Sequence, residues 1–320
     1  MEKAAHLRTG RMAALVLSLL LGVCLSGCSL LTPSRTEAAR NREQVAPALD
    51  ASSLVEEGVL TVALDTADAP QGMTGTDGEV TGYYADVARA LAQRLGLKVA
   101  FVSATSASNS LPDGSADIFL GAASASDDEV TVFGSCLEDA PALFVKDVDA
   151  ATVSAGTLST MTVGVQTSSA AADALAKAGV TAEQKAYANV NECFDALASG
   201  EVDCVACDAT AGAYLARAYE GVGFAGTLGA VSVSGVAVLS SASDLSDEVS
   251  TAFEEIASDG TLSAVHAQWY GSLPSSLSDA LVNGVTLSED DGQDAPADTP
   301  ASSSDSSSEV DLSDINRFDG

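Results

Sequence analysis

Acidic side chains stand directly after two apolar runs of this 320-residue chain. Asp65 and Asp68 follow the run VLTVAL at residues 59–64, and Asp208 follows the run VDCVAC at residues 202–207. Such runs are typical of buried strands, and small molecules bind beyond the carboxyl ends of strands in open α/β sheets. A carboxylate in that place can accept charge-assisted hydrogen bonds from an ammonium group. The three aspartates are therefore candidate ligand-binding residues, although Asp208 could instead only cap a helix over residues 209–219.

Serine side chains occupy similar positions after two further apolar runs. Ser124 and Ser126 follow IFLGAA at residues 118–123, while Ser168 and Ser169 come shortly after MTVGV at residues 161–165. The second pair lies at the expected start of a helix, where hydroxyl and unpaired backbone N–H groups suit a carboxylate or another anion. Plain N-capping of that helix is the alternative, and the two roles are compatible.

The elements that must position these residues follow a plan that occurs twice. Residues 81–102 predict a turn, a helix with one apolar stripe, a glycine cap and a strand. Both halves of the chain then carry G-x-x-D before an apolar strand, as GSAD at 114–117 and GEVD at 200–203. Strand–helix–strand units build parallel sheets. We therefore predict two α/β lobes, linked by the extended runs at 142–145 and 231–239.

Two groups of residues carry a resemblance to a known family. The first group lies around the first predicted helix and consists of Gly82, Tyr83, Asp86, Val87, Leu95 and Gly96. The second group lies in the C-terminal helices and consists of Asp259, Gly260, Thr261, Leu262, Val265, Trp269, Tyr270 and Gly271. In these residues the chain resembles the bacterial extracellular solute-binding proteins of family 3, the receptors of polar amino acid ABC importers. The resemblance implies a binding protein without a cofactor, and not an enzyme.

The same resemblance implies a two-lobed α/β fold of the periplasmic-binding-protein type II, with two strands linking the lobes. Its expected boundaries are lobe one at 54–142, lobe two at 143–234, and a return to lobe one with C-terminal helices at 235–274. It also implies roles for single residues. Ser169 corresponds to a contact of the ligand carboxylate and Asp208 to the acceptor of the ligand ammonium. Ser124 corresponds to a ligand-contacting serine, and Asp65 to a position that can meet the ligand side chain.

Two departures from the family pattern change the expected ligand. The family has an arginine after the lobe-one serine to bind the ligand carboxylate, whereas residues 126–129 are Ser-Asp-Asp-Glu. The family's aromatic clamp is replaced by Asp-Ala-Pro-Gln at 68–71. We therefore expect a ligand of amine or cationic character, bound by Asp208 with help from Asp65 or Asp68. An amino acid held only through Ser168 and Ser169 is an alternative, and a degenerate receptor is another.

The two ends of the chain predict export and anchoring. Residues 1–27 combine basic residues with an apolar run too short to span a membrane, which is typical of a secretory signal peptide. The run ends in LSGC, which resembles a lipobox, so we expect lipidation of Cys28 and attachment to the outer face of the cell membrane. Residues 28–53 predict a flexible linker. Residues 275–320 are acidic and Ser-rich, which predicts a disordered tail.

Four cysteines remain after the signal peptide and Cys28 are set aside: Cys136, Cys193, Cys204, Cys207. Export favours disulfides, and four cysteines allow three connectivities. The helix over 191–199 should run antiparallel to the strand over 203–208, so a disulfide between Cys193 and Cys207 is slightly preferred. A metal site is not expected, because His266 is the one histidine left in the mature chain and lies far from the cysteines.

The net charge of −31 argues against nucleic acid as a partner. The predicted function is a lipid-anchored receptor that delivers an amino acid or a related small amine to the permease of an ABC importer. The alternatives on the same fold are a sensory or partner-binding lipoprotein and an exported dehydratase-like enzyme. An enzyme would need a general acid–base pair in the cleft, and only carboxylates are candidates there.

Overall fold

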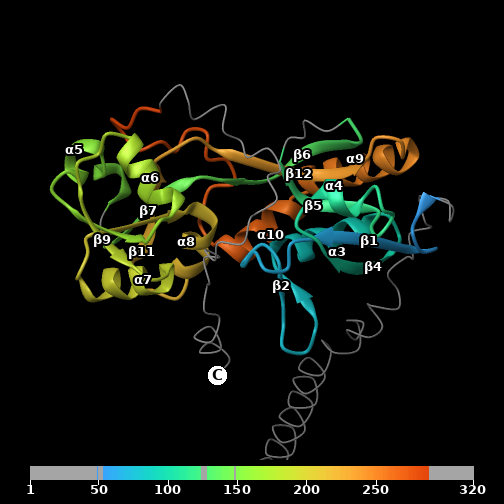
Figure 1. The fold of residues 1–320 in the computed structure, drawn as a ribbon, viewed down its shortest axis with the longest axis horizontal. Helices are drawn as coiled ribbons and strands as arrows, with labels where there is room; N and C mark the ends of the chain where they lie inside the picture. Colours follow the sequence, from blue (N-terminus) through green and yellow to red (C-terminus); the bar gives the residue numbers. More distant parts are fainter. Residues whose placement is uncertain (1–48, 50–52, 124–127, 148, 288–320) are drawn as a thin grey trace, which may run out of the picture. The chain divides into compact units, whose positions relative to one another are not determined.

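The computed structural model describes residues 49, 53–123, 128–147 and 149–287. The predicted signal peptide, Cys28, most of the linker, Ser124 and Ser126 lie outside these residues. Figure 1 shows two groups of helices and strands joined by extended segments. Within the described ranges, no helix has both the length and the apolar character that a membrane crossing requires.

Lobe one is built on a mixed sheet with the strand order β4-β1-β5-β12-β6. Its strands and helices, in chain order, are β1 (Val59–Leu64), α3 (Tyr83–Arg94), β4 (Lys98–Ser103), α4 (Ala107–Ser110), β5 (Ile118–Ala123), β6 (Val130–Asp139), β12 (Ser232–Leu239), α9 (Ser243–Ser258) and α10 (Thr261–Tyr270). β1 pairs in parallel with β4 and β5, whereas β12 is antiparallel to β5 and β6. A small hairpin of β2 (Met73–Thr74) and β3 (Val80–Thr81) precedes α3.

Apolar periodicity explains why these segments adopt their structures. Leu60, Val62 and Leu64 of β1 are fully buried, and α3 packs Val87 and Leu91 toward the sheet and toward α9 and α10. The stripe predicted for α3 is therefore the face that covers β1 and β4.

Lobe two is a second sheet with the strand order β11-β7-β10-β8-β9. Its elements are β7 (Pro141–Lys146), η2 (Ala150–Thr152), α5 (Ala155–Leu158), β8 (Thr162–Gln166), α6 (Ala170–Lys177), β9 (Glu183–Tyr187), α7 (Val190–Ser199), β10 (Cys204–Asp208), α8 (Ala209–Ala216) and β11 (Val222–Thr227). The first four residues of β10 are all buried, because α6, α7 and α8 all contact this central strand.

The repeated G-x-x-D motif has the same structural role in both lobes. Asp117 N donates to the Thr61 carbonyl at 2.8 Å, and an Asp117 carboxylate oxygen accepts from Thr61 N at 2.6 Å. Asp203 N donates to the Thr162 carbonyl at 2.9 Å, and its carboxylate accepts from Thr162 N at 2.8 Å. Each aspartate thus joins the strand that it precedes to the first parallel strand of its own lobe.

The chain crosses between the two sheets just before the predicted runs at 142–145 and 231–239, and these runs lie in or overlap β7 and β12. It leaves the first sheet at Asp139, where β6 ends, and enters the second at Pro141, where β7 begins. It returns between Thr227 at the end of β11 and Ser232 at the start of β12. β7 and β12 are the extended segments that join the two groups of elements in Figure 1.

Residues 275–287 do not begin the disordered tail, contrary to the prediction. Leu277, Val282 and Val285 in this segment are at most 5% exposed. Leu277 N donates to a Glu138 carboxylate oxygen at 2.6 Å, and Thr227 N donates to the carbonyl of residue 280 at 2.8 Å. The segment lacks helical or strand periodicity, which explains the error, but its spaced apolar side chains complete buried clusters.

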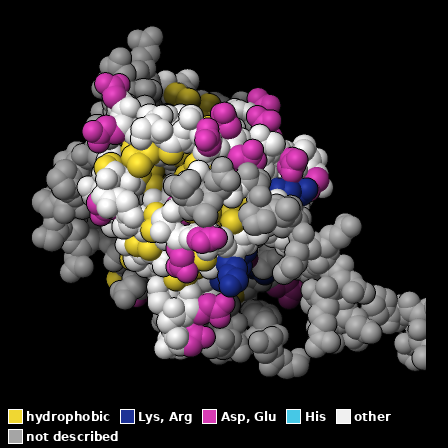
Figure 2. All heavy atoms as spheres, turned by 90° about the vertical axis from the view of Figure 1, so that its right-hand side faces the viewer, with side chains coloured by type: hydrophobic (Ala, Val, Ile, Leu, Met, Phe, Trp, Pro, Cys, Tyr) yellow, Lys and Arg dark blue, Asp and Glu magenta, His cyan; other side chains and the backbone are white. Residues whose placement is uncertain are grey.

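The surface agrees with the strongly acidic composition. Figure 2 shows aspartate and glutamate side chains spread over the face that it presents, with lysine and arginine in few places. Like charges on a surface repel polyanions and keep proteins soluble. This face gives no support for a nucleic-acid partner.

Candidate ligand-binding site

The loop after β1 carries Asp65 and Asp68 in a tight turn. Asp65 Oδ1 accepts a hydrogen bond from Ala67 N at 2.8 Å, and Gly72 N donates to the Asp68 carbonyl at 2.7 Å. A Cβ atom at Gly72 would lie 2.2 Å from the Asp65 carbonyl oxygen, so only glycine permits this close approach. The turn holds both carboxylates at the carboxyl end of β1.

Asp208 comes from lobe two and lies close to Asp68. Burial raises the pKa of Asp68 to about 6, and the like charges of Asp65 and Asp208 act in the same direction. Burial also raises the pKa of Asp208. Asp68 and Asp208 nevertheless keep exposed surface, so a ligand can reach them. The structure thus brings together the three aspartates predicted from the sequence.

Asp208 occupies the N-cap position of α8, but its side chain makes no capping hydrogen bond. The alternative role predicted for this residue, capping of the following helix, is therefore not supported by the side-chain geometry. A carboxylate that does not cap its helix remains available to an incoming donor.

A hydrogen-bonded chain of three side chains passes from lobe one to lobe two beside these aspartates. Gln71 Nε2 donates to Thr210 Oγ1 at 2.9 Å, and Thr210 Oγ1 donates to Asp139 Oδ2 at 2.6 Å. Thr210 N also donates to Asp139 Oδ1 at 3.1 Å. Gln71 lies in the loop after β1, Asp139 ends β6, and Thr210 lies in the first turn of α8. The chain therefore connects the loop, the interlobe link and lobe two.

Asp139 is the most strongly perturbed carboxyl group of this region. Burial raises its pKa to about 7, and the charge of Asp208 adds to this effect, while the hydrogen bonds from Thr210 and Ala140 oppose it. The phenol of Tyr270 lies near these aspartates. Burial raises its pKa most, and Tyr84, Tyr83, Asp139 and Asp68 add to the effect. The group that was predicted as three carboxylates is thus four.

Ser169 is the N-cap residue of α6, and its hydroxyl oxygen accepts from Ala172 N at 3.2 Å. Ser168 has a left-handed backbone with φ of 58°. The predicted capping role is therefore present at Ser169. None of the described contacts joins Ser168 or Ser169 to Asp65, Asp68 or Asp208.

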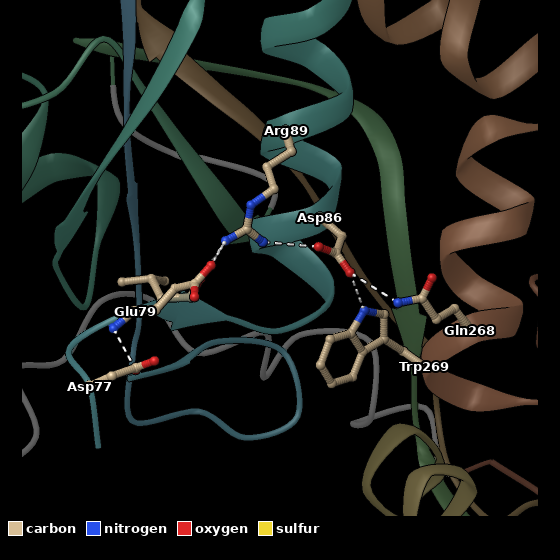
Figure 3. Close-up of polar contacts among 7 residues, drawn as sticks. Asp77, Glu79, Asp86, Arg89, Gln268 and Trp269 are labelled. Atoms are coloured by element: carbon tan, nitrogen blue, oxygen red, sulfur yellow. Dashed lines mark hydrogen bonds and ion pairs between the residues drawn. The ribbon is translucent and has the colours of Figure 1, made fainter. Parts of the chain in front are cut away.

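The ion pairs between described residues lie away from the four aspartates. Arg89 pairs with Glu79 and Asp86, as Figure 3 shows, and the other pairs join Arg94 to Glu255 and Asp259, and Lys185 to Glu201. Asp86 also accepts from Trp269 Nε1 at 2.8 Å. These two residues of the sequence signature therefore join α3 to α10 and do not belong to the candidate site.

The predicted disulfide between Cys193 and Cys207 is not formed. The structure has free, buried thiols at Cys136, Cys193, Cys204 and Cys207. Helix α7 does contact β10, and Cys193 contributes to the raised pKa of Cys207, after burial and Asp208. However, Cys193 Sγ donates to the Asn189 carbonyl at 3.4 Å, one turn earlier in its own helix. The two elements are in contact as predicted, but the two cysteines are not joined.

Sequence reasoning missed Asp139, Thr210 and the role of Gln71. Gln71 was noticed only as the replacement of an aromatic residue, and Asp139 lay in the predicted lobe one, shortly before the link predicted at 142–145. Their partners are 139 and 71 residues away along the chain. The one available signal was an acidic residue three positions before the predicted link at 142–145.

A comparison with protein-family models finds the bacterial extracellular solute-binding proteins, family 3, over residues 60–146. The matched segment contains the first of the two groups of residues that carry the resemblance, at 82–96. A comparison with curated proteins gave no match.

Solved structures resemble this chain over about two thirds of its length. An ancestral cationic amino acid solute binding protein is 25% identical, with a TM-score of 0.56, covering 67% of this chain and 96% of its own. A substrate binding protein of a polar amino acid ABC uptake transporter from Streptococcus thermophilus is 18% identical, with a TM-score of 0.62 and coverage of 70% and 90%. The L-cystine solute receptor of Neisseria gonorrhoeae is 21% identical, with a TM-score of 0.59 and coverage of 68% and 95%. The chain has the two-lobed α/β fold of type II periplasmic binding proteins.

Proposed function

We propose that this chain, similar to the family 3 solute-binding proteins, is an exported receptor for an amino acid or small amine of cationic character. The observation that carries the proposal is the meeting of Asp65, Asp68 and Asp208 from two lobes. Burial raises the pKa of Asp68, and the like charges of Asp65 and Asp208 add to this effect. A ligand ammonium would neutralise this repulsion and donate several charge-assisted hydrogen bonds to the carboxylates.

The position of Asp208 supports this role. It ends β10, at the carboxyl edge of the lobe-two sheet, and keeps exposed surface without a capping bond. The similarity to an ancestral cationic amino acid solute binding protein points in the same direction. The acidic replacement of the family's arginine segment also disfavours a purely anionic ligand.

Capture of the ligand would proceed by hinge closure. The lobes are joined by the link between β6 and β7 and by the return into β12. The ligand would bind one lobe first, and the other lobe would close over it by rotation about these links. The closed form would then dock on the permease of an ABC importer.

Anchoring of the receptor rests on the N-terminal sequence. The run that ends in LSGC would be processed to place a lipidated Cys28 at the start of the mature chain. Residues 28–53 would then connect the lipid to the two lobes, on the outer face of the cell membrane.

A thermal-shift screen of the purified protein tests the proposal. A ligand that binds the folded state must raise the melting temperature. The panel contains cationic, neutral and acidic amino acids and small amines, and the variant Asp208→Asn is measured beside the unchanged protein. We expect hits among cations that disappear in the variant. Hits confined to acidic amino acids, or no hit at all, would contradict the proposal.

A further inference from the structure

Gln71 has an unusual environment for a side chain in a loop. It is only 9% exposed, and its Oε1 atom is buried without a hydrogen-bond donor among the described residues. Its Nε2 atom donates to Thr210 Oγ1 at 2.9 Å. Since Oε1 and Nε2 share one amide carbon, the unpaired oxygen lies close to the hydrogen-bonded chain that Nε2 joins. A buried acceptor without a donor is costly, which indicates that a donor from outside the described chain pairs with it.

The groups around Gln71 offer negative charge that no ion pair between described residues neutralises. Asp139 follows Thr210 in the hydrogen-bonded chain. Burial raises the pKa of Asp139, and the charge of nearby Asp208 raises it further. Asp68 in turn interacts with Asp208. Within the described residues, no ion pair reaches any of these aspartates.

Tyr270 adds a second unpaired polar atom to the same region. Its hydroxyl is buried without a partner among the described residues, and Asp139 and Asp68 are among the neighbours that raise its pKa, after burial and the tyrosines Tyr84 and Tyr83. A neutral phenol can accept or donate one hydrogen bond but supplies no positive charge. Its presence does not offset the acidic surplus.

An α-amino acid fits this arrangement poorly. Its carboxylate would meet the like charges of the aspartates, and like-charge contacts disfavour a ligand strongly. A molecule with two amine groups and no carboxylate would instead meet opposite charges and a hydrogen-bond acceptor. One ammonium can lie against Asp68 and Asp208, while the N–H groups of the second reach Gln71 Oε1, with the charge of Asp139 behind Thr210.

We propose that the preferred ligands are aliphatic diamines, and that Gln71 is the residue that selects the second amine. This inference rests on the proposed function and deepens it, because it names the ligand class of the same site. Asp139 acts as a positioning residue, which holds Thr210 and contributes charge without direct contact.

Isothermal titration calorimetry with matched ligand pairs tests the inference. Cadaverine differs from lysine only in lacking the carboxylate, and putrescine stands in the same relation to ornithine. At pH 7.5 and low salt, we expect each diamine to bind the purified protein at least about tenfold more tightly than its amino acid. That factor corresponds to about one hydrogen bond to a charged group.

The outcomes separate this inference from the proposed function. Tighter binding of lysine or ornithine overturns the diamine class but leaves an amino acid receptor. Binding of neutral amino acids alone also overturns it and removes the cationic part of the proposed function. Absence of heat from every ligand refutes both.

The role of Gln71 is tested with a variant of similar size. Pentylamine is cadaverine without its second amine, so the ratio of their affinities measures recognition of that amine. In Gln71→Leu we expect this ratio to fall by about tenfold, while pentylamine itself changes by less than about twofold. Gln93→Leu, at an exposed position of α3, is the matched control and should keep the ratio. An unchanged ratio in Gln71→Leu would refute the assignment.

Discussion

Replacing Thr210 by valine removes the hydroxyl that joins Gln71 to Asp139 and keeps the shape of the side chain. Thr210 is fully buried, with Oγ1 at 2.6 Å from Asp139 Oδ2 and at 2.9 Å from Gln71 Nε2. The variant Thr210→Val leaves the Gln71 amide without its acceptor and weakens the solvation of the Asp139 carboxylate. Asp139 keeps the backbone donors of residues 210 and 140, at 3.1 and 2.9 Å.

The expected loss follows from the two bonds. A hydrogen bond to a charged group contributes about 1.5–3 kcal/mol, and an orphaned buried donor costs about 1–3 kcal/mol. The backbone donors and the more apolar valine offset part of this loss, so we expect the free energy of unfolding to fall by about 3 kcal/mol. For a domain of this size, that change lowers the melting temperature by about 6–12 °C.

Thr210→Ser is the matched control, because it keeps the hydroxyl and removes only a methyl group. Its expected cost is about 1 kcal/mol, and the assay is thermal unfolding followed by circular dichroism. The deficit of Thr210→Val should be larger at pH 8 than at pH 5, since Asp139 with a pKa of about 7 is ionised only at the higher pH. If Thr210→Val is as stable as Thr210→Ser at pH 8, the hydroxyl does not join the lobes as described.

Three further predictions concern the folded chain. Tyr83→Phe should lower the free energy of unfolding in urea by about 1–2 kcal/mol, because the Tyr83 hydroxyl donates to the buried Cys136 carbonyl at 2.6 Å. The control Tyr219→Phe removes an exposed hydrogen bond to Asp195 and should cost less than about 0.5 kcal/mol. Equal costs would contradict the role of burial. Because the pKa of Asp139 is raised, the folded chain binds more protons than the unfolded chain between about pH 4 and pH 7. The ligand-free protein should therefore lose stability relative to Asp139→Asn as the pH rises through this window. A gain in stability would refute the assignment. Thiol labelling should modify Cys136, Cys193, Cys204 and Cys207 only after unfolding, and prior reduction should not change the mass of the protein. Labelling of these cysteines in the native protein would contradict their burial.

The sequence predicted the fold well where short-range patterns determine structure. Apolar runs became β1, β5, β8 and β10, and the stripe after Tyr83 became α3. These elements bury continuous or periodic apolar residues, which a window of a few residues reveals. The G-x-x-D repeat also identified equivalent positions, since Asp117 and Asp203 join strands in the same way.

The sequence was less informative where structure depends on distant partners. The contact of Gln71 with Thr210 spans 139 residues, and neither residue belongs to a local pattern. Residues 275–287 were assigned to the tail because spaced apolar residues without periodicity carry no local signal, although Leu277 and Val282 are buried. The disulfide prediction placed Cys193 near Cys207 from element geometry, but bond formation depends on side-chain direction.

The cationic ligand is the central claim, and one titration tests it most directly. The strongest cation from the thermal screen is titrated into the unchanged protein, into Asp208→Asn and into Asp173→Asn. Asp173 lies exposed on α6, so its variant makes the same change of charge away from the site. Removing one partner of a buried charge pair costs about 2–5 kcal/mol, so we predict that Asp208→Asn weakens binding by at least about thirtyfold, while Asp173→Asn stays within about twofold. Equal affinities in all three proteins would contradict the account.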